Sequence, residues 1–202
     1  MKILFLGYRS CRLISFLRDC DMHTIVESTD KISFESVRDF DPDLIISYGY
    51  RHILKGNILQ TYKDKIINLH ISYLPWNRGA YPNIWSAIDD TPHGITIHLI
   101  DEGIDTGDIL YQKKIDIPLS DSLRTAYEKL QSEIQDLFIK NWKEIENFKF
   151  TRIKQDHKLA TLHFTKSSKI LFKKLGILGN WNLTMKETKE RNDLRLLEKG
   201  VS

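Results

Sequence analysis

The chain has 202 residues, enough for one well-cored domain, and its 41% hydrophobic and 28% charged residues are ordinary for a globular protein. No apolar run approaches the roughly 18 residues needed to cross a bilayer, and the opening "MKILFLGYRS" predicts a first strand and not a signal peptide. Two cysteines, Cys11 and Cys20, make neither a disulfide framework nor a zinc pattern. We therefore expect a cytoplasmic protein that has no membrane partner and holds no metal.

The formal net charge of +3 conceals an asymmetry along the chain. Residues 1–148 hold 17 Lys and Arg against 22 Asp and Glu, about −5, whereas residues 149–202 hold 13 against 5, about +8. A basic segment can attract a phosphorylated ligand, RNA or a membrane surface. More often, such a segment simply forms a solvent-exposed, lysine-rich surface. A binding role and a solvent-exposed surface both stay open here.

Short apolar runs alternate with helical patterns through the first 150 residues. In chain order we expect a strand at Lys2–Gly7, a helix at Arg9–Asp19, a strand at His23–Ser28, a helix at Ser33–Phe40, strands at Asp43–Gly49 and Lys65–Ile71, a helix at Asn83–Asp90, and strands at Gly94–Ile100 and Asp108–Ile117. Continuous apolar strands separated by helices predict an α/β fold, with a parallel or mixed sheet covered on both faces.

A long helix with one apolar stripe is expected from about Ser122 to Phe148. Beyond it the pattern weakens, and we expect two strands of a hairpin followed by two short helices. These segments are "KFTRIKQ", "ATLHFTK", "SSKILFKKLG" and "TMKETKERNDLRLLEKG". The prediction is one main domain over residues 1–148 and a small helix and hairpin extension over residues 149–202.

The loop after the first strand, "FLGYRSCR", stands where a doubly wound fold binds phosphates. It contains a single glycine, Gly7, so there is neither a dinucleotide fingerprint nor a P-loop. We interpret Gly7 as a turn residue.

Asn68 and His70 alternate with apolar residues in "INLHI" and so point to the same side of a strand. A hydrogen-bonded pair in the core is one explanation, because buried polar groups are normally paired. The strand is followed by "SYLPWNRGAYPNIWS", a loop with two prolines and Arg78. Loops at the carboxyl ends of the strands of an open α/β sheet are where ligands bind, and this favours a functional site.

An acidic loop, "IDEGIDTGD", joins two of the expected strands and contains Asp101, Glu102 and Asp105. Clustered carboxylates suit a hard cation, but the calcium-loop spacing is absent and Asp-Gly turns are common structural features. Asp105 follows His98 by seven residues, and we expect His70 and Asp105 to face each other as a proton-transfer pair. Serine-nucleophile, zinc-protease and kinase signatures are missing.

Taken together, these blocks resemble the formyltransferase family, whose members carry a formyl group from 10-formyltetrahydrofolate to an amine. The shared features are Asn-x-His, Ser-x-Leu-Pro, an Arg-Gly loop and Thr-x-His with Asp seven residues later. The resemblance covers roughly Met1 to Leu137 and is strongest over Ile67–Gln112, where it is closest to the branch that acts on nucleotide-linked amino sugars. It implies a Rossmann-like fold with a mostly parallel central sheet.

The resemblance implies three catalytic residues: Asn68, His70 and Asp105. Asn68 and His70 would donate to the oxyanion of the tetrahedral intermediate, and Asp105 would take the proton of the attacking amine, directly or through a water.

The resemblance also implies where N10-formyltetrahydrofolate and the amine bind. The folate pocket would comprise Tyr50, Arg51, His52, Ile53, Leu54, Ile100, Asp101, Glu102, Gly103 and Ile104, although Ile53 and Leu54 also suit a helix core. The amine substrate would meet Tyr8, Arg9, Ser10, Trp76, Asn77, Arg78, Gly79, Tyr81, Asn83 and Trp85. Arg78 would pair with a pyrophosphate and an aromatic ring would stack on a base, although any one of these aromatics is more often structural.

The expected substrate is therefore a nucleotide-diphosphate-linked amino deoxysugar, such as dTDP-4-amino-4,6-dideoxyglucose or its 3-amino isomer, used for bacterial O-antigen or lipopolysaccharide. Formylation of glycinamide ribonucleotide for purine synthesis is the alternative within the family. A non-catalytic nucleotide- or nucleic-acid-binding module is the alternative from another class. Against RNA, about 65 residues after Leu137 are too few for the extra barrel domain of transfer-RNA formyltransferases. The expected hairpin suggests a homodimer contact.

Overall fold

The computed structural model of the protein describes residues 1–8, 12–20 and 23–198. The chain forms two compact units, each assembled from separate stretches of sequence. The first unit comprises Met1–His70, Thr96–Tyr111 and Ile134–Gln155, and the second comprises Ile71–Ile95, Gln112–Glu133 and Asp156–Ser202. The division at residue 148 stays a prediction.

A six-stranded sheet runs in the order β2-β1-β3-β4-β6-β7. Its strands are β1 (Lys2–Gly7), β2 (Thr24–Ser28), β3 (Leu44–Tyr48), β4 (Ile66–His70), β6 (Gly94–Leu99) and β7 (Ile109–Lys114). The first four are mutually parallel, and β6 pairs antiparallel with β4. The predicted mostly parallel sheet is confirmed, and the turn to antiparallel pairing occurs at the strand that carries Asn68 and His70.

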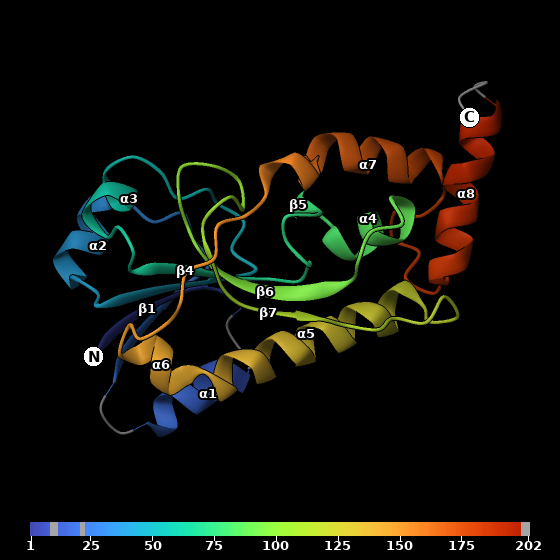
Figure 1. Cartoon of the computed structure of the whole chain (residues 1–202). Helices are drawn as coiled ribbons and strands as arrows, with labels where there is room; N and C mark the ends of the chain where they lie inside the picture. Colours follow the sequence, from blue (N-terminus) through green and yellow to red (C-terminus); the bar gives the residue numbers. More distant parts are fainter. Residues whose placement is uncertain (9–11, 21–22, 199–202) are drawn as a thin grey trace. The chain divides into compact units, whose positions relative to one another are not determined.

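Both faces of the sheet in the first unit are covered by helices, which explains the continuous apolar strands. Figure 1 shows α2 (Phe34–Phe40) and α3 (Asn57–Thr61) on one face, and α1 (Arg12–Asp19) and α6 (Trp142–Glu146) on the other. Alternate residues of β1 serve the two faces, with Leu4 and Leu6 packing in one core cluster with residues of α2 and α3. The predicted α/β architecture is therefore confirmed.

The long helix expected over residues 122–148 is interrupted at Asn141. The structure has α5 (Leu123–Lys140) and then α6, with Asn141 between them. The Asn141 side chain donates to Leu137 O at 2.7 Å, and its backbone N–H is shared between the carbonyls of Leu137 and Phe138. An asparagine side chain that bonds the carbonyl four residues back competes with the helical ladder, which explains the break.

The hairpin expected after residue 148 is wrong. Ile153 pairs with Ile109 of β7, whereas β8 (Leu162–His163) pairs in parallel with the two-residue strand β5 (Arg78–Gly79). Between the two segments the chain makes a short 3-10 turn, η1 (His157–Leu159), whose first turn is capped by the Asp156 carboxylate. The connection between the two segments forms this helical turn and not the tight reverse turn of a hairpin. The two segments therefore do not pair with each other, and each pairs with an earlier part of the chain.

The second unit contains α4 (Pro82–Ile88), α7 (Thr165–Lys174) and α8 (Met185–Glu198), so the helices expected in these regions are confirmed. A reciprocal capping box starts α8, because Glu187 N–H donates to Thr184 Oγ1 at 3.1 Å and Thr184 N–H donates to Glu187 Oε2 at 2.7 Å. The hydrogen bonds that the Thr184 backbone N–H and hydroxyl donate to the Glu187 carboxylate lower its pKa. Among the described residues, no helix combines the length and apolar character that a membrane span needs.

The end of β1 can be tested at Gly7. Its φ is +119°, and a Cβ there would lie 1.9 Å from Tyr48 O, so Gly7→Ala should lower the free energy of unfolding by at least about 2 kcal/mol. Gly179 is the matched control, because its φ is +81° at the third position of the turn closed by Asn180 N–H and Ile177 O, and a Cβ there would meet no atom within 4 Å; Gly179→Ala should cost only about 1 kcal/mol. Urea unfolding measures both, and equal losses would contradict the close approach at Gly7.

Candidate active site

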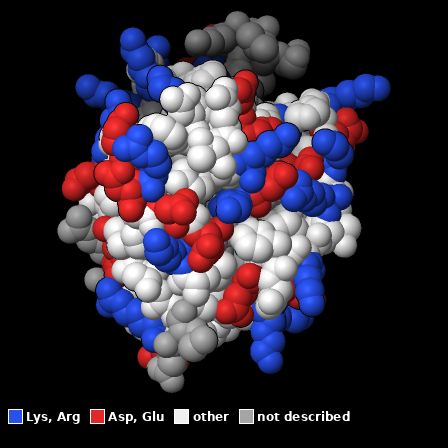
Figure 2. All heavy atoms as spheres, turned by 90° about the vertical axis from the view of Figure 1, so that its left-hand side faces the viewer, with Lys and Arg blue, Asp and Glu red and all other residues white. Residues whose placement is uncertain are grey.

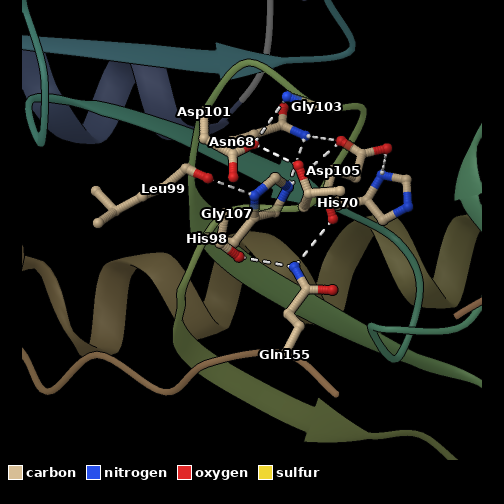
Figure 3. Close-up of polar contacts among 10 residues, drawn as sticks. Asn68, His70, His98, Leu99, Asp101, Gly103, Asp105, Gly107 and Gln155 are labelled. Carbon is tan, nitrogen blue, oxygen red and sulfur yellow. Dashed lines mark hydrogen bonds and ion pairs between the residues drawn. The ribbon is translucent and has the colours of Figure 1, made fainter. Parts of the chain in front are cut away.

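Asn68 and His70 lie on β4, which pairs in parallel with β3 on one side and antiparallel with β6 on the other. Antiparallel pairing places Asn68 opposite His98 and His70 opposite Thr96 of β6. Residues directly opposite on adjacent antiparallel strands have side chains about 5 Å apart on the same face. The pairing therefore gathers one amide and two imidazoles on one face of the sheet, as the view in Figure 3 shows.

Asp105 comes from the loop between β6 and β7 and has a left-handed backbone, with φ 51°. Aspartate is among the few residues that adopt this conformation readily. Within the loop, Asp101 Oδ1 accepts hydrogen bonds from Gly103 N at 3.1 Å and from the Thr106 hydroxyl. Asp101 thus stabilises the turn, and the loop presents Asp105 to the sheet.

The structure brings together the three predicted catalytic side chains. Asn68 Nδ2 donates to Asp105 Oδ1 at 3.2 Å, and His70 Nδ1 lies 3.7 Å from Asp105 Oδ2. Only 9% of the His70 side chain and 15% of the Asp105 side chain are exposed. The site therefore holds a carboxylate, an amide and an imidazole largely away from water, where charge interactions are stronger than in bulk solvent.

His98 is a fourth member of this group and was not among the predicted catalytic residues. Its side chain is 1% exposed, and its Nε2 lies 3.2 Å from Asn68 Nδ2 and 3.4 Å from Asp105 Oδ1. Its Nδ1 lies 2.8 Å from Leu99 O, and since a carbonyl oxygen only accepts, Nδ1 carries the hydrogen. In the neutral ring Nε2 is then an acceptor, so Asn68 directs one amide hydrogen to His98 and the other to Asp105.

The spacing of seven residues between His98 and Asp105 was visible in the sequence. The partner of His98 was not, because it depends on the register between β4 and β6.

The arrangement can accept a proton on Asp105 and stabilise a developing negative charge with donors from Asn68 and His70. Within residues 1–8, 12–20 and 23–198, no group of three or more His, Cys, Asp or Glu side chains is arranged to hold a metal ion.

The first segment of the predicted folate pocket follows β3. The Tyr50 hydroxyl donates to Asp30 O at 2.7 Å and accepts from Ile32 N at 3.1 Å, and burial raises its pKa. Leu54 is 6% exposed and belongs to the core cluster beneath α2 and α3, whereas Ile53 is 71% exposed. Of the two apolar walls expected here, Ile53 is the one that remains accessible to a ligand.

The second segment of the predicted folate pocket borders a cavity of about 540 Å³ in the first unit. Ile100, Asp101 and Glu102 line this cavity together with Leu59 and Lys63, among others. Its lining also includes the ion pairs Arg152–Asp64 at 2.8 Å and Lys154–Asp108 at 3.5 Å. The loop that carries Asp105 therefore has an open space beside it that is polar as well as apolar.

The predicted amine-binding loop belongs to the second unit, and the C-terminal segment of the chain holds it. Asn77 is fully buried; its backbone N–H donates to Thr161 Oγ1 at 2.7 Å and its side-chain amide donates to Thr91 Oγ1 at 2.7 Å. Arg78 is 6% exposed, and its Nη2 lies 3.2 Å from His157 Nδ1. Both predicted substrate residues therefore have structural contacts in this structure.

The aromatic residues of the same loop pack in a similar way. Trp85 stacks on His163 with ring centroids 3.7 Å apart and donates to Ser168 Oγ at 2.9 Å, and Tyr81 packs edge-on against Phe172. Trp76 stacks on Tyr73, Asn83 is 2% exposed, and a Cβ on Gly79 would lie 2.3 Å from His163 O.

Three predicted substrate residues follow β1 in the first unit. Tyr8 is 41% exposed and packs edge-on against Tyr48. Arg9 and Ser10 lie outside the described residues.

Residues 23–141 match the family model described as formyl transferase, which is more than half of the chain. The fold and the meeting of Asn68, His70 and Asp105 agree with this match, and the chain belongs to the formyl transferase family.

Among solved structures, the chain is similar to the formyltransferase PseJ from Anoxybacillus kamchatkensis, with 38% identity, a TM-score of 0.87, and coverage of 95% of this chain and 100% of that one. That structure is a complex with UDP-4,6-dideoxy-4-formamido-L-AltNAc and tetrahydrofolate. The N-formyltransferase from Helicobacter canadensis, in complex with folinic acid and dTDP-3-aminofucose, shares the fold at 22% identity and a TM-score of 0.67, covering 82% of this chain and 71% of that one.

Curated relatives include the methionyl-tRNA formyltransferase of Finegoldia magna, which is 30% identical over 173 residues. The alignment covers 80% of this chain and 56% of that protein, so the chain spans about half the length of this relative.

The contacts of His98 can be tested by His98→Phe. The substitution keeps a ring but leaves Leu99 O and one Asn68 hydrogen without their partner, so the free energy of unfolding should fall by about 1–3 kcal/mol. Urea unfolding measures this. His52→Phe is the control, because His52 is exposed and the change should stay within about 0.5 kcal/mol. If the two variants lost equal stability, His98 would not hold Asn68 and Leu99 as described.

Proposed function

We propose that the protein transfers a formyl group from N10-formyltetrahydrofolate to the amine of a nucleotide-diphosphate-linked amino sugar. The observation that carries the proposal is the meeting of Asn68, His70 and Asp105, with the amide 3.2 Å and the imidazole 3.7 Å from the carboxylate. The similarity to PseJ, which extends over the whole of that chain, supports the choice of substrate class.

The reaction joins the amine nitrogen to the formyl carbon and breaks the bond between that carbon and N10 of the folate. One proton leaves the amine and one is gained by N10. Asp105 is the group that accepts the amine proton, directly or through a water, because it is the carboxylate at the centre of the site. The same group then returns a proton toward N10, so the carboxylate ends the cycle ionised.

Asn68 and His70 stabilise the oxyanion that forms on the formyl oxygen. A preorganised donor of this kind contributes about 3 kcal/mol to the transition state. Without substrate, one hydrogen of the Asn68 amide is donated to Asp105. When Asp105 takes up a proton it becomes a weaker acceptor, and the amide hydrogen is then available to the substrate oxygen.

The amine that we propose is a UDP-linked 4-amino-4,6-dideoxy sugar, since the product bound in the PseJ structure carries its formamido group at that position. The dTDP-linked 4-amino and 3-amino sugars are the neighbouring candidates. We propose that the loop from Trp76 to Trp85 binds the nucleotide, and that Arg78 forms an ion pair with the pyrophosphate. Use of the product in surface polysaccharide, a homodimer and a cytoplasmic location stay predictions.

Formylation of methionyl-tRNA is a second candidate, favoured by the curated relatives and by the basic charge of residues 149–202. On the face shown in Figure 2, Lys and Arg side chains lie among Asp and Glu side chains, so this face offers no surface of one sign. A polyanion such as tRNA is held best by a surface of one sign.

An amine panel tests the proposal. The protein is incubated with 10-formyltetrahydrofolate and, separately, with UDP-4-amino-4,6-dideoxy-L-AltNAc, dTDP-4-amino and dTDP-3-amino sugars, glycinamide ribonucleotide and methionyl-tRNA. Product is measured by mass spectrometry. We expect kcat/KM for a nucleotide sugar to exceed that for the other amines by at least about 10³-fold, because a site built for one polar substrate rejects others strongly.

Turnover of the ribonucleotide or of methionyl-tRNA alone would overturn the sugar assignment. Absence of turnover with every amine would favour a non-catalytic binding module.

A further inference from the structure

Gln155 makes a two-pronged contact with the loop that carries Asp105. Its Nε2 donates to Asp105 O at 2.9 Å and to Gly107 O at 2.7 Å, as Figure 3 shows. The residue is 6% exposed. A side-chain amide has two N–H donors, so a single buried group satisfies carbonyls on both sides of Thr106.

The position of Gln155 is set by backbone pairing at the end of the first unit. Ile153 and Ile109 exchange hydrogen bonds in both directions, with N···O distances of 2.8 and 2.9 Å. This pairing attaches residues 153–155 beside the start of β7, where the acidic loop ends. Gln155 is therefore brought to the loop by a strand contact that does not involve the loop itself.

The segment that Gln155 holds has an unfavourable backbone and tight packing. Asp105 has a left-handed φ of 51°, which is uncommon for any residue other than glycine, although aspartate adopts it more readily than most. On the other side of the segment, a Cβ on Gly107 would lie 1.9 Å from Leu99 O, so this backbone lies directly against the end of β6. The segment is thus fixed between β6 and the Gln155 amide.

We propose that Gln155 is a positioning residue for Asp105. By holding the carbonyls of residues 105 and 107, it keeps the Asp105 carboxylate between Asn68 and His70. Gln155 acts through Asp105 and not on the substrate. The expected kinetic effect rests on the proposed function, but the effect on the loop does not.

The first arm of the test needs no substrate. Gln155→Met keeps the length and volume of the side chain and removes both donors. We expect backbone hydrogen exchange, followed by mass spectrometry, to be at least about 10-fold faster in peptides covering residues 101–109 of the variant, because the segment has lost its restraint. Exchange unchanged from the parent would overturn the proposal.

The second arm measures turnover of the amine that the panel identifies. A displacement of about 1 Å at a reacting group costs about 10²-fold in rate, so kcat of Gln155→Met should fall by about 100-fold while KM for each substrate changes by less than about 3-fold. In an Asp105→Asn background the same substitution should cost less than about 3-fold further, because the group it positions is already lost.

Equal losses from Gln155→Met in the two backgrounds would indicate a general structural role and would overturn the proposal. A parent protein without turnover on any amine would instead contradict the proposed function, and the exchange measurement would still decide the role of Gln155.

Arg191→Met is the matched control. Arg191 Nη1 also bonds two carbonyls, those of Leu175 at 2.9 Å and Gly176 at 3.2 Å, but in the second unit, and none of these three residues is a predicted site residue. Its loss should lower stability and leave both kcat and the exchange of residues 101–109 unchanged. If the control moved kcat as much as Gln155→Met, the kinetic effect would reflect stability alone and the proposal would fail.

Discussion

The antiparallel pairing of β6 with β4 is the constraint on which the site depends. β1 to β4 are parallel, and the direction first changes at β6. The change places His98 beside Asn68, and it lets the chain return into the loop that carries Asp105. A parallel neighbour would need a long crossover at this point, and the loop would then leave from the opposite edge of the sheet.

Each polar group of the site has a partner that fixes its orientation. Leu99 O selects the tautomer of His98, and His98 in turn accepts from Asn68. Buried polar groups cost free energy unless they are paired, so a network of this kind maintains a single arrangement. The result is a carboxylate held close to two donors before any substrate arrives, which is the preorganisation that transition-state stabilisation requires.

The loop predicted to bind the amine depends on the other end of the chain. β8 pairs with β5, Thr161 bonds Asn77, and His163 stacks on Trp85. The C-terminal segment therefore fixes the conformation of this loop. In a protein with a different C-terminal segment the same loop sequence would have different supports, which offers a physical reason why relatives in one family can differ in the amine they accept.

Local pattern predicted much of this architecture. Asn68 and His70 stood out because polar residues with strand spacing interrupt an apolar run, and the strands themselves were visible as continuous hydrophobic stretches. Contacts between distant residues were not visible: the register that pairs Asn68 with His98, and the 50 residues between Asp105 and Gln155, leave no local signal. The break at Asn141 and the pairing of Ile153 with Ile109 were missed for related reasons. The helical periodicity of the sequence continues through Asn141, so it does not indicate the break. Strand propensity can indicate that Ile153 lies in an extended segment, but it does not indicate which strand that segment pairs with.

The most direct test of the account is a comparison of rate and affinity in Asp105→Asn. The substitution keeps the size of the side chain and removes the carboxylate that we propose as the acceptor of the amine proton. The account predicts that kcat for formyl transfer falls by about 10³-fold, within the range for loss of a general base, while the dissociation constant of tetrahydrofolate measured by calorimetry changes by less than about 3-fold. A variant that keeps its rate, or that loses affinity as much as rate, would contradict it.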